Sequence, residues 1–298
     1  MADNKRCVYL IDASIYIFRA YYSVPDTLTN NDGQLINALH GFAGFLADFL
    51  EKARPEHVAV AFDESLTTSF RNRIYPDYKA NREEPPEELS LQFGFCRLLV
   101  RTLGLADFSS DCYEADDLIG TLAQRLREQG FSVVILSADK DLAQLLEEGD
   151  MLWDFARNRK HQYETIHDWL GVHAPQVADW LALAGDSVDN IAGVPGIGAK
   201  TAAALLAQFN SLQEIYEQID AVADLKIRGA ARVQRLLQEH KEAALLARRL
   251  TGIVTDADMQ GDAQQLLRRS ISSDELTSVC DQLGLGRMTQ ARLLRLSG

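Results

Sequence analysis

The first 170 residues alternate between short apolar runs and longer segments with helical periodicity. The apolar runs have the length of strands buried on both faces of a sheet and span residues 7–11, 57–62, 131–138 and 151–155. Apolar positions recur every three or four residues, as in amphipathic helices, in residues 36–53, 91–103 and 115–128. Strands that alternate with helices predict an α/β domain with a central, mostly parallel sheet flanked by helices.

The pattern changes after Trp169. The strand-like runs end there, and helical periodicity dominates the rest of the chain. The expected helices span residues 175–184, 199–209, 211–219, 230–250, 273–283 and 288–296. A length of 298 residues suits about two domains. We therefore predict an α/β domain over residues 1–170 and a helical region over residues 171–298.

Residues 64–90 form a long connection without apolar periodicity. Cations and tyrosines are interleaved there, among them Arg71, Tyr78, Lys79 and Arg82. Such a mixture suits a surface that binds phosphates and bases. A mobile solvent-exposed loop would have a similar composition, and composition alone leaves both interpretations open.

Acidic residues follow the predicted strands at the point where each strand ends. Asp12, Asp63 and Asp139 come directly after three separate apolar runs, so they should meet at one edge of a parallel sheet. Six more acids are expected near the same edge: Glu114, Asp116, Asp117, Asp141, Asp186 and Asp189. Each could simply cap a helix or interact with its dipole. Together they predict a site for a divalent metal, and oxygen-only ligands favour Mg²⁺ or Mn²⁺ over Zn²⁺.

The charge distribution supports a concentrated acidic site. The chain carries 30 Lys and Arg against 43 Asp and Glu, for a formal net charge of −13. This balance argues against a simple basic nucleic-acid binder. The excess lies before residue 199, since residues 199–298 hold 13 basic and 12 acidic residues. The nine acids above account for most of it.

No apolar stretch approaches the ~20 residues of a membrane span, and the first apolar run is too short for a signal peptide. The four cysteines are scattered, with no closely spaced pair. Reduced thiols in a cytoplasmic protein without a membrane partner are therefore expected.

A glycine-rich turn at residues 193–201 lies between two helical patterns. It is no Walker P-loop, because Ala199 stands where that motif needs glycine before Lys200. A turn of this kind exposes backbone N–H groups beside a helix N-terminus, which suits a phosphate. It could also be a plain helix–helix turn. We call residues 193–201 the glycine turn.

These motifs, taken together, resemble the 5′-nuclease (flap endonuclease) superfamily, which includes the 5′→3′ exonuclease domain of bacterial DNA polymerase I. The motifs appear in the family's order up to about residue 206. They are Leu10-Ile11-Asp12-Ala13-Ser14 with Arg19-Ala20-Tyr21, Ala61-Phe62-Asp63, Tyr78-Lys79-Ala80-Asn81-Arg82, Glu114-Ala115-Asp116-Asp117-Leu118-Ile119-Gly120, Asp139-Lys140-Asp141, and Gly185-Asp186 through Lys200.

The resemblance implies a PIN-like nuclease fold with a helical arch over residues 64–90, which we call the arch segment. It also implies a helix-hairpin-helix-type (H3TH) motif at residues 185–206 that grips DNA and, in this family, often holds K⁺. The acids around a first, catalytic metal would be Asp12, Asp63, Glu114, Asp116 and Asp117. Those around a second would be Asp139, Asp141, Asp186 and Asp189.

The resemblance also assigns contacts to DNA. Lys79 and Arg82 would contact the scissile phosphate, and they count with Asp116 as catalytic residues. Tyr78 would stack on a base, and Arg19 would lie near the 5′ end. The remaining expected DNA contacts are Arg71, Gly193, Gly196, Gly198, Lys200 and Thr201.

The function that follows is hydrolysis of DNA by two-metal-ion catalysis, as a structure-specific 5′→3′ exonuclease and 5′-flap endonuclease. DNA with 5′ flaps or 5′ ends is the expected partner, RNA primers are a further substrate, and a monomer in the bacterial cytoplasm is the expected form. Two alternatives stay open: a junction-binding protein that does not cut, and a PIN-like ribonuclease. Hydrolases that use Ser or Cys as a nucleophile lack their signatures here.

Overall fold

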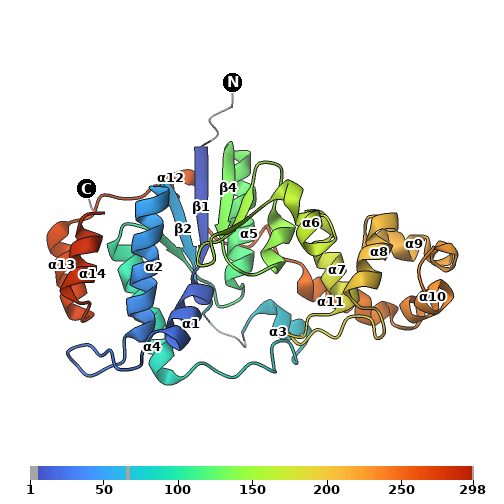
Figure 1. The fold of residues 1–298 in the computed structure, drawn as a ribbon, viewed down its shortest axis with the longest axis horizontal. Coiled ribbons are helices and arrows are strands. Elements are labelled where there is room, and N and C mark those ends of the chain that lie inside the picture. The colour runs from blue at the N-terminus through green and yellow to red at the C-terminus, as the bar shows by residue number, and fades with distance from the viewer. Residues whose placement is uncertain (1–5, 65–67, 297–298) are drawn as a thin grey trace.

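The computed structural model describes residues 6–64 and 68–296. Its centre is a six-stranded sheet in the order β3-β2-β1-β4-β5-β6 (Figure 1). The strands are β1 (Arg6–Asp12), β2 (His57–Ala61), β3 (Ala106–Phe108), β4 (Phe131–Leu136), β5 (Met151–Asp154) and β6 (Arg159–Gln162). Every neighbouring pair is parallel except β5 and β6, which are antiparallel. The predicted mostly parallel sheet is confirmed.

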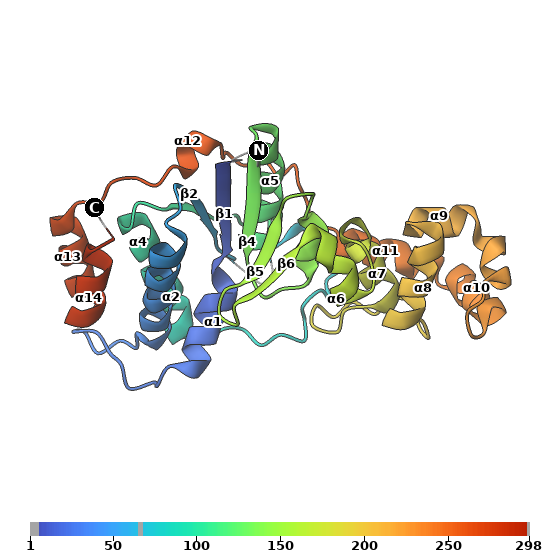
Figure 2. The same ribbon diagram turned by 45° about the horizontal axis from the view of Figure 1, so that its top comes forward.

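Helices cover both faces of the sheet (Figures 1 and 2). One face packs on α1 (Ala13–Ser23), α2 (Asn37–Ala53) and α4 (Glu87–Thr102). Phe42, Leu46 and Phe49 of α2 lie three or four residues apart and are completely buried, as the amphipathic pattern predicts. The other face packs on α5 (Ala115–Glu128).

A helical region extends from the β6 side of the sheet (Figure 2). It contains α6 (Ile166–Leu170), α7 (Val177–Ala184), α8 (Ala199–Phe209), α9 (Leu212–Glu217), α10 (Ala230–Glu239) and α11 (Lys241–Thr251). Short 3-10 helices occur at Asp141–Leu145, Tyr163–Thr165, Ala174–Gln176 and Ile219–Asp224.

The chain then returns to the sheet. The amides of Arg268 and Arg269 donate hydrogen bonds to the carbonyls of Glu56 and Gly104. After α12 (Ala263–Leu266), the helices α13 (Ser273–Gln282) and α14 (Arg287–Leu294) pack beside α4 and α2 (Figure 1). The last helices therefore lie with the α/β part of the molecule, although they follow the helical region in sequence.

Several expected boundaries were wrong. The single helix expected at residues 230–250 is two helices that change direction at His240, because α10 packs on residues 219–224 whereas α11 packs on α7. The strand expected at residues 131–138 ends at Leu136. No helix of the described chain is both long and apolar enough to cross a bilayer.

The topology places a crevice at the carboxyl ends of β1 and β4. The chain passes from β1 toward β2 on one side and from β4 toward β5 on the other, so the strand order reverses between these two neighbours. Loops diverge at such a point and leave room for a ligand. The acids that follow β1 and β4 therefore stand at the natural binding position of the fold.

Candidate active site

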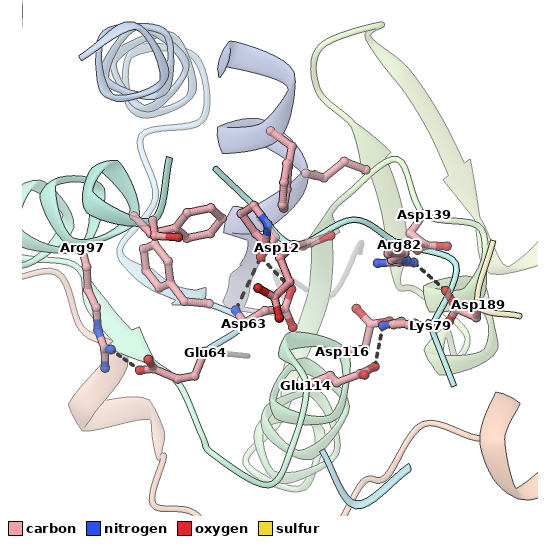
Figure 3. A pocket seen from close by; sticks show the side chains of 18 of the residues that line it. Asp12, Asp63, Glu64, Lys79, Arg82, Arg97, Glu114, Asp116, Asp139 and Asp189 are labelled. Atoms are coloured by element: carbon pink, nitrogen blue, oxygen red, sulfur yellow. Dashed lines mark hydrogen bonds and ion pairs between the residues drawn. The ribbon is translucent and has the colours of Figure 1, made fainter. Parts of the chain in front are cut away.

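A cavity of about 690 Å³ opens at this edge of the sheet (Figure 3). Its walls come from the arch segment, from α1 and α4, and from the loops that follow the strands. Six of the nine expected metal-binding acids line it: Asp12, Asp63, Glu114, Asp116, Asp139 and Asp189. The structure thus brings together acids separated by up to 177 positions in the sequence.

Hydrogen bonds hold the acids that follow the strands. The Ser14 hydroxyl donates to Asp63 Oδ2 at 2.7 Å, and the amide of Ala115 donates to Asp63 Oδ1 at 2.9 Å. The Ser137 hydroxyl donates to Asp12 Oδ2 at 2.9 Å. Each serine therefore binds a carboxylate at the end of a neighbouring strand, which fixes the acids relative to one another.

Crowding of these carboxylates disfavours their charged forms. Burial, together with the charge of Asp63, raises the pKa of Asp12 to about 7. Burial and the carboxylates of Asp139 and Asp12 raise the pKa of Asp116 well above its usual range. Burial and Asp139 raise the pKa of Asp141 to about 7. Carboxylates that repel one another in this way are stabilised by bound cations.

Two cations of the arch segment reach into the cavity (Figure 3). Lys79 Nζ lies 2.9 Å from Glu114 Oε2, and Arg82 Nη2 lies 2.5 Å from Asp189 Oδ1. Burial alone would lower the pKa of Lys79, but the carboxylates of Glu114 and Asp189 outweigh it and raise the pKa. Lys79 also has a left-handed backbone, with φ of +56°, which sets the direction of the side chain.

A second group of acids lies beside the cavity. Lys140 Nζ contacts Asp141 Oδ1 at 3.1 Å and Asp186 Oδ2 at 2.8 Å. Burial alone would raise the pKa of Asp186, but its hydrogen bond and ion pair with Lys140 lower it. Asp139 Oδ1 accepts the amide of Asp141 at 2.9 Å and so connects this group to the cavity.

The donor set fits Mg²⁺ or Mn²⁺, because it contains only carboxylate oxygens, and their repulsion favours a divalent cation. In the described ranges 6–64 and 68–296, no three Asp, Glu, His or Cys side chains are placed so that they could hold an ion as they stand. Binding of two metal ions therefore stays a prediction.

Three expected site residues have other surroundings than we predicted. Arg71 is 2% exposed, and its guanidinium binds Asp117 and two backbone carbonyls, so it has no surface for DNA. Asp117 is completely buried, does not line the cavity, and binds the Arg71 guanidinium through both carboxylate oxygens. Tyr78 is 3% exposed and its hydroxyl donates to Glu114 and Asp189, so no base can stack on its ring in this conformation.

The arch segment, whose residues 65–67 lie outside the described structure, rests on the loop before the glycine turn. Its one helix among residues 68–86 is the short α3 (Phe70–Ile74). The Lys79 amide donates to the Asp189 carbonyl at 3.1 Å, and Asn81 Nδ2 donates to the Ser187 carbonyl at 2.8 Å. These contacts join the two segments from which we expected phosphate contacts.

The glycine turn leads into α8. Gly193 is buried with φ of +63°, and a Cβ there would lie 2.3 Å from the amide nitrogen of Gly185, so its glycine is required by packing. Gly196, Gly198 and Lys200 are exposed, and Thr201 is partly exposed in the first turn of α8. Arg19 is exposed on α1.

Sequence reasoning assigned no role to Ser14, Ser137 or Lys140, although Ser14 and Lys140 lie in the motifs named above. Lys140 lies between Asp139 and Asp141, so the Asp-Lys-Asp motif itself was a signal for a cation among the acids. The serines lie two residues from Asp12 and Asp139 in sequence, but each binds a different acid. Only the order of the strands shows which carboxylate each serine holds.

Comparison with known proteins places the chain in a family. The model of the 5′-3′ exonuclease N-terminal resolvase-like domain matches residues 7–171, and that of the 5′-3′ exonuclease C-terminal SAM fold matches residues 172–274. The chain belongs to the 5′-3′ exonuclease family. The resemblance and fold class predicted from the sequence are confirmed.

Curated relatives of this 5′-3′ exonuclease family member include DNA polymerase I of Bacillus subtilis, which is 35% identical over 297 residues, covering 97% of this chain and 32% of the relative. DNA polymerase I of Chloroflexus aurantiacus is 38% identical over 270 residues, covering 86% of this chain and 27% of the relative. The chain thus spans about a third of the length of the curated relatives it matches.

Two solved structures share the fold of the 5′-3′ exonuclease family member. T5 5′-exonuclease with bound zinc ions aligns with a TM-score of 0.67 and is 19% identical. The alignment covers 97% of this chain and 97% of that one. The catalytic core of Rad2 in complex with DNA substrate aligns with a TM-score of 0.65 and is 15% identical, with coverage of 98% of this chain and 92% of that one.

Proposed function

We propose that this chain is a metal-dependent nuclease that cuts DNA near junctions between single-stranded 5′ ends and duplex. It would act as a 5′→3′ exonuclease and a 5′-flap endonuclease, and removal of RNA primers is a further use. The observation that carries the proposal is the cavity in which six acids face two cations of the arch segment. Family membership supports the reaction class.

Carboxylates on either side of the cavity would hold two divalent ions. The first set is Asp12, Asp63, Glu114 and Asp116, and the second is Asp139, Asp141, Asp186 and Asp189. When bound, Mg²⁺ or Mn²⁺ supplies a water with a lowered pKa and stabilises charge on the attacking and leaving oxygens. The T5 5′-exonuclease neighbour was solved with divalent zinc, which supports a divalent ion here.

The chain's own groups would position the substrate. Ser14 and Ser137 keep the carboxylates of Asp63 and Asp12 in place, so little reorganisation is needed during the reaction. Lys79 and Arg82 would exchange their present carboxylate partners for oxygens of the scissile phosphate.

Duplex binding is assigned to the glycine turn. The exposed residues Gly196, Gly198 and Lys200 would contact backbone phosphates together with Thr201, and K⁺ would bind at the same turn. The short connection from Asp189, which lines the cavity, to Gly193 keeps the glycine turn at a fixed distance from the cavity. Arg19 would contact the 5′ end. We expect a monomer in the cytoplasm, and the bacterial DNA polymerase I relatives support that setting.

The deciding experiment is cleavage of a 5′-end-labelled flap with Mg²⁺ or with EDTA, beside the matched duplex without a flap. Metal-dependent cutting near the junction would support the proposal. Binding without cutting, with Mn²⁺ also tried, would favour the non-catalytic alternative, and cutting of single-stranded RNA alone would favour a ribonuclease.

An inert variant separates chemistry from binding. Asp116→Ala removes an acid of the cavity and should abolish cutting while flap binding persists, because the duplex contacts lie elsewhere. Asp111→Ala removes an exposed acid five residues earlier and serves as the control, which should cut like the wild type. Cutting by Asp116→Ala at the wild-type rate would refute the assignment of the metal site.

A further inference from the structure

A buried ion pair beside Glu114 of the cavity joins three separate segments of the chain. Arg71 Nη1 and Nη2 donate to Asp117 Oδ2 and Oδ1 at 2.7 and 2.8 Å. The same guanidinium donates from Nε to the Leu250 carbonyl and from Nη2 to the Gly252 carbonyl, both at 2.8 Å. The pair therefore connects the arch segment, the first turn of α5 and the end of α11. We call it the Arg71–Asp117 junction.

The carboxylate of Asp117 has donors on both of its oxygens. Besides Arg71, Oδ2 accepts the amide of Glu114 at 3.1 Å and Oδ1 accepts the amide of Val254 at 2.9 Å. The Asp117 side chain has no exposed surface. Four donors on one buried carboxylate leave no room for a metal ion, so Asp117 differs from the acids that line the cavity.

The junction reaches the cavity through two routes. The first is Glu114, whose amide donates to Asp117 while its side chain contacts Lys79 in the cavity. The second is the arch segment itself, because Arg71 lies on α3, eight residues before Lys79. Both partners of the Lys79–Glu114 ion pair are thus attached to the same buried anchor.

We infer that Arg71 is a positioning residue that acts through Asp117, and that neither residue contacts DNA or metal. The junction holds the backbone of Glu114 and the arch segment in the arrangement that pairs Lys79 with Glu114. Only the rate measurement for this inference rests on the proposed function.

Two conservative variants test the assignment. Arg71→Lys keeps the buried charge but cannot bind both Asp117 oxygens and two carbonyls, and Asp117→Asn keeps the shape of the side chain. Each should slow single-turnover flap cleavage about 10- to 100-fold, as loss of an orienting contact does. Flap affinity should change less than about threefold, and the Mg²⁺ concentration for half-maximal rate should stay unchanged. Asp116→Asn should raise that concentration and serves as the comparison.

The double variant Arg71→Lys with Asp117→Asn shows whether the two residues act together as one junction or have two independent roles. Residues of one junction should show strong coupling, so the double variant should be little slower than the slower single variant. If the two losses multiply, or if Asp117→Asn shifts the Mg²⁺ dependence as Asp116→Asn does, the inference is wrong. A loss of flap affinity in Arg71→Lys with an unchanged rate at saturation would also overturn it.

Hydrogen exchange gives a measurement that does not depend on catalysis. The Val254 amide donates to Asp117, so both variants should exchange this amide at least tenfold faster while the β1 and β4 amides stay protected. Arg73→Lys is the matched control, because Arg73 is exposed on the same helix, and its exchange should match the wild type. Unchanged exchange at Val254 would refute the junction. Faster exchange in a chain whose wild type cuts no flap would support the junction and refute the proposed function.

Discussion

At the scale of single residues, the acids of the cavity make stability depend on pH. Asp12 has a pKa of about 7 in the folded protein against an ordinary 3.8, so the folded form binds the proton more tightly. Its contribution to stability is present below about pH 4 and is lost as the pH rises through 7. The Tm of metal-free wild type should fall more between pH 5 and 8 than that of Asp12→Asn. Mg²⁺ should restore Tm chiefly at pH 8, and parallel pH profiles would contradict this expectation.

Lys79 allows a second test at this scale. Its ammonium lies in the cavity 2.9 Å from Glu114, where it can stabilise charge that develops on a phosphate. Removal of such a group typically slows a reaction about 10²- to 10³-fold. We expect Lys79→Ala to slow single-turnover flap cleavage to this extent, with a smaller loss of duplex affinity. Lys160→Ala removes an exposed cation over Trp153 and is the control. An unchanged cleavage rate in Lys79→Ala would show that Lys79 takes no part in the reaction.

At the scale of elements, the sequence predicted the helices and strands that have a regular pattern of apolar positions. It missed the features that depend on contacts between distant segments of the chain. The helix at residues 115–128 and the strand at residues 151–155 were found because their apolar spacing is regular. β3 has three residues and β6 is the polar sequence Arg-Lys-His-Gln, so neither has a periodic signal. The shared location of the acids could be predicted from their positions at the ends of the apolar runs. The buried positions of Arg71, Asp117 and Tyr78 did not, because their partners lie on distant segments.

The glycine turn is an element whose shape depends on one residue. A Cβ on Gly193 would clash with Gly185, and φ of +63° is strained for a residue with a side chain. Gly193→Ala should lower the free energy of unfolding in urea by about 2 kcal/mol or more. Gly198→Ala is the control for stability, because a Cβ at Gly198 would meet no atom beyond its chain neighbours within 4 Å and the φ there is −98°. Equal stabilities of the two variants would show that the turn tolerates another backbone shape.

For the whole molecule, the charges are arranged by region. The carboxylates of the cavity lie at one edge of the sheet, whereas the helical region carries exposed cations that include Lys200, Lys226 and Arg232. At physiological salt, charges separated by much more than about 8 Å are largely screened. A net charge of −13 therefore does not prevent local contact between the helical region and the phosphates of a duplex.

This arrangement predicts how salt controls binding. Each phosphate neutralised by Lys or Arg releases counterions, so the logarithm of duplex affinity should fall linearly with the logarithm of salt concentration. Lys200→Ala should reduce the magnitude of that slope by about 1, because it removes one of the proposed phosphate contacts. Lys52→Ala should leave the slope unchanged, because Lys52 lies on α2 and donates to Asn158, away from the helical region. Equal slopes for Lys200→Ala and the wild type would show that the duplex does not bind at the glycine turn. A slope reduced equally by both variants would mean that net charge, and not a local contact, governs binding.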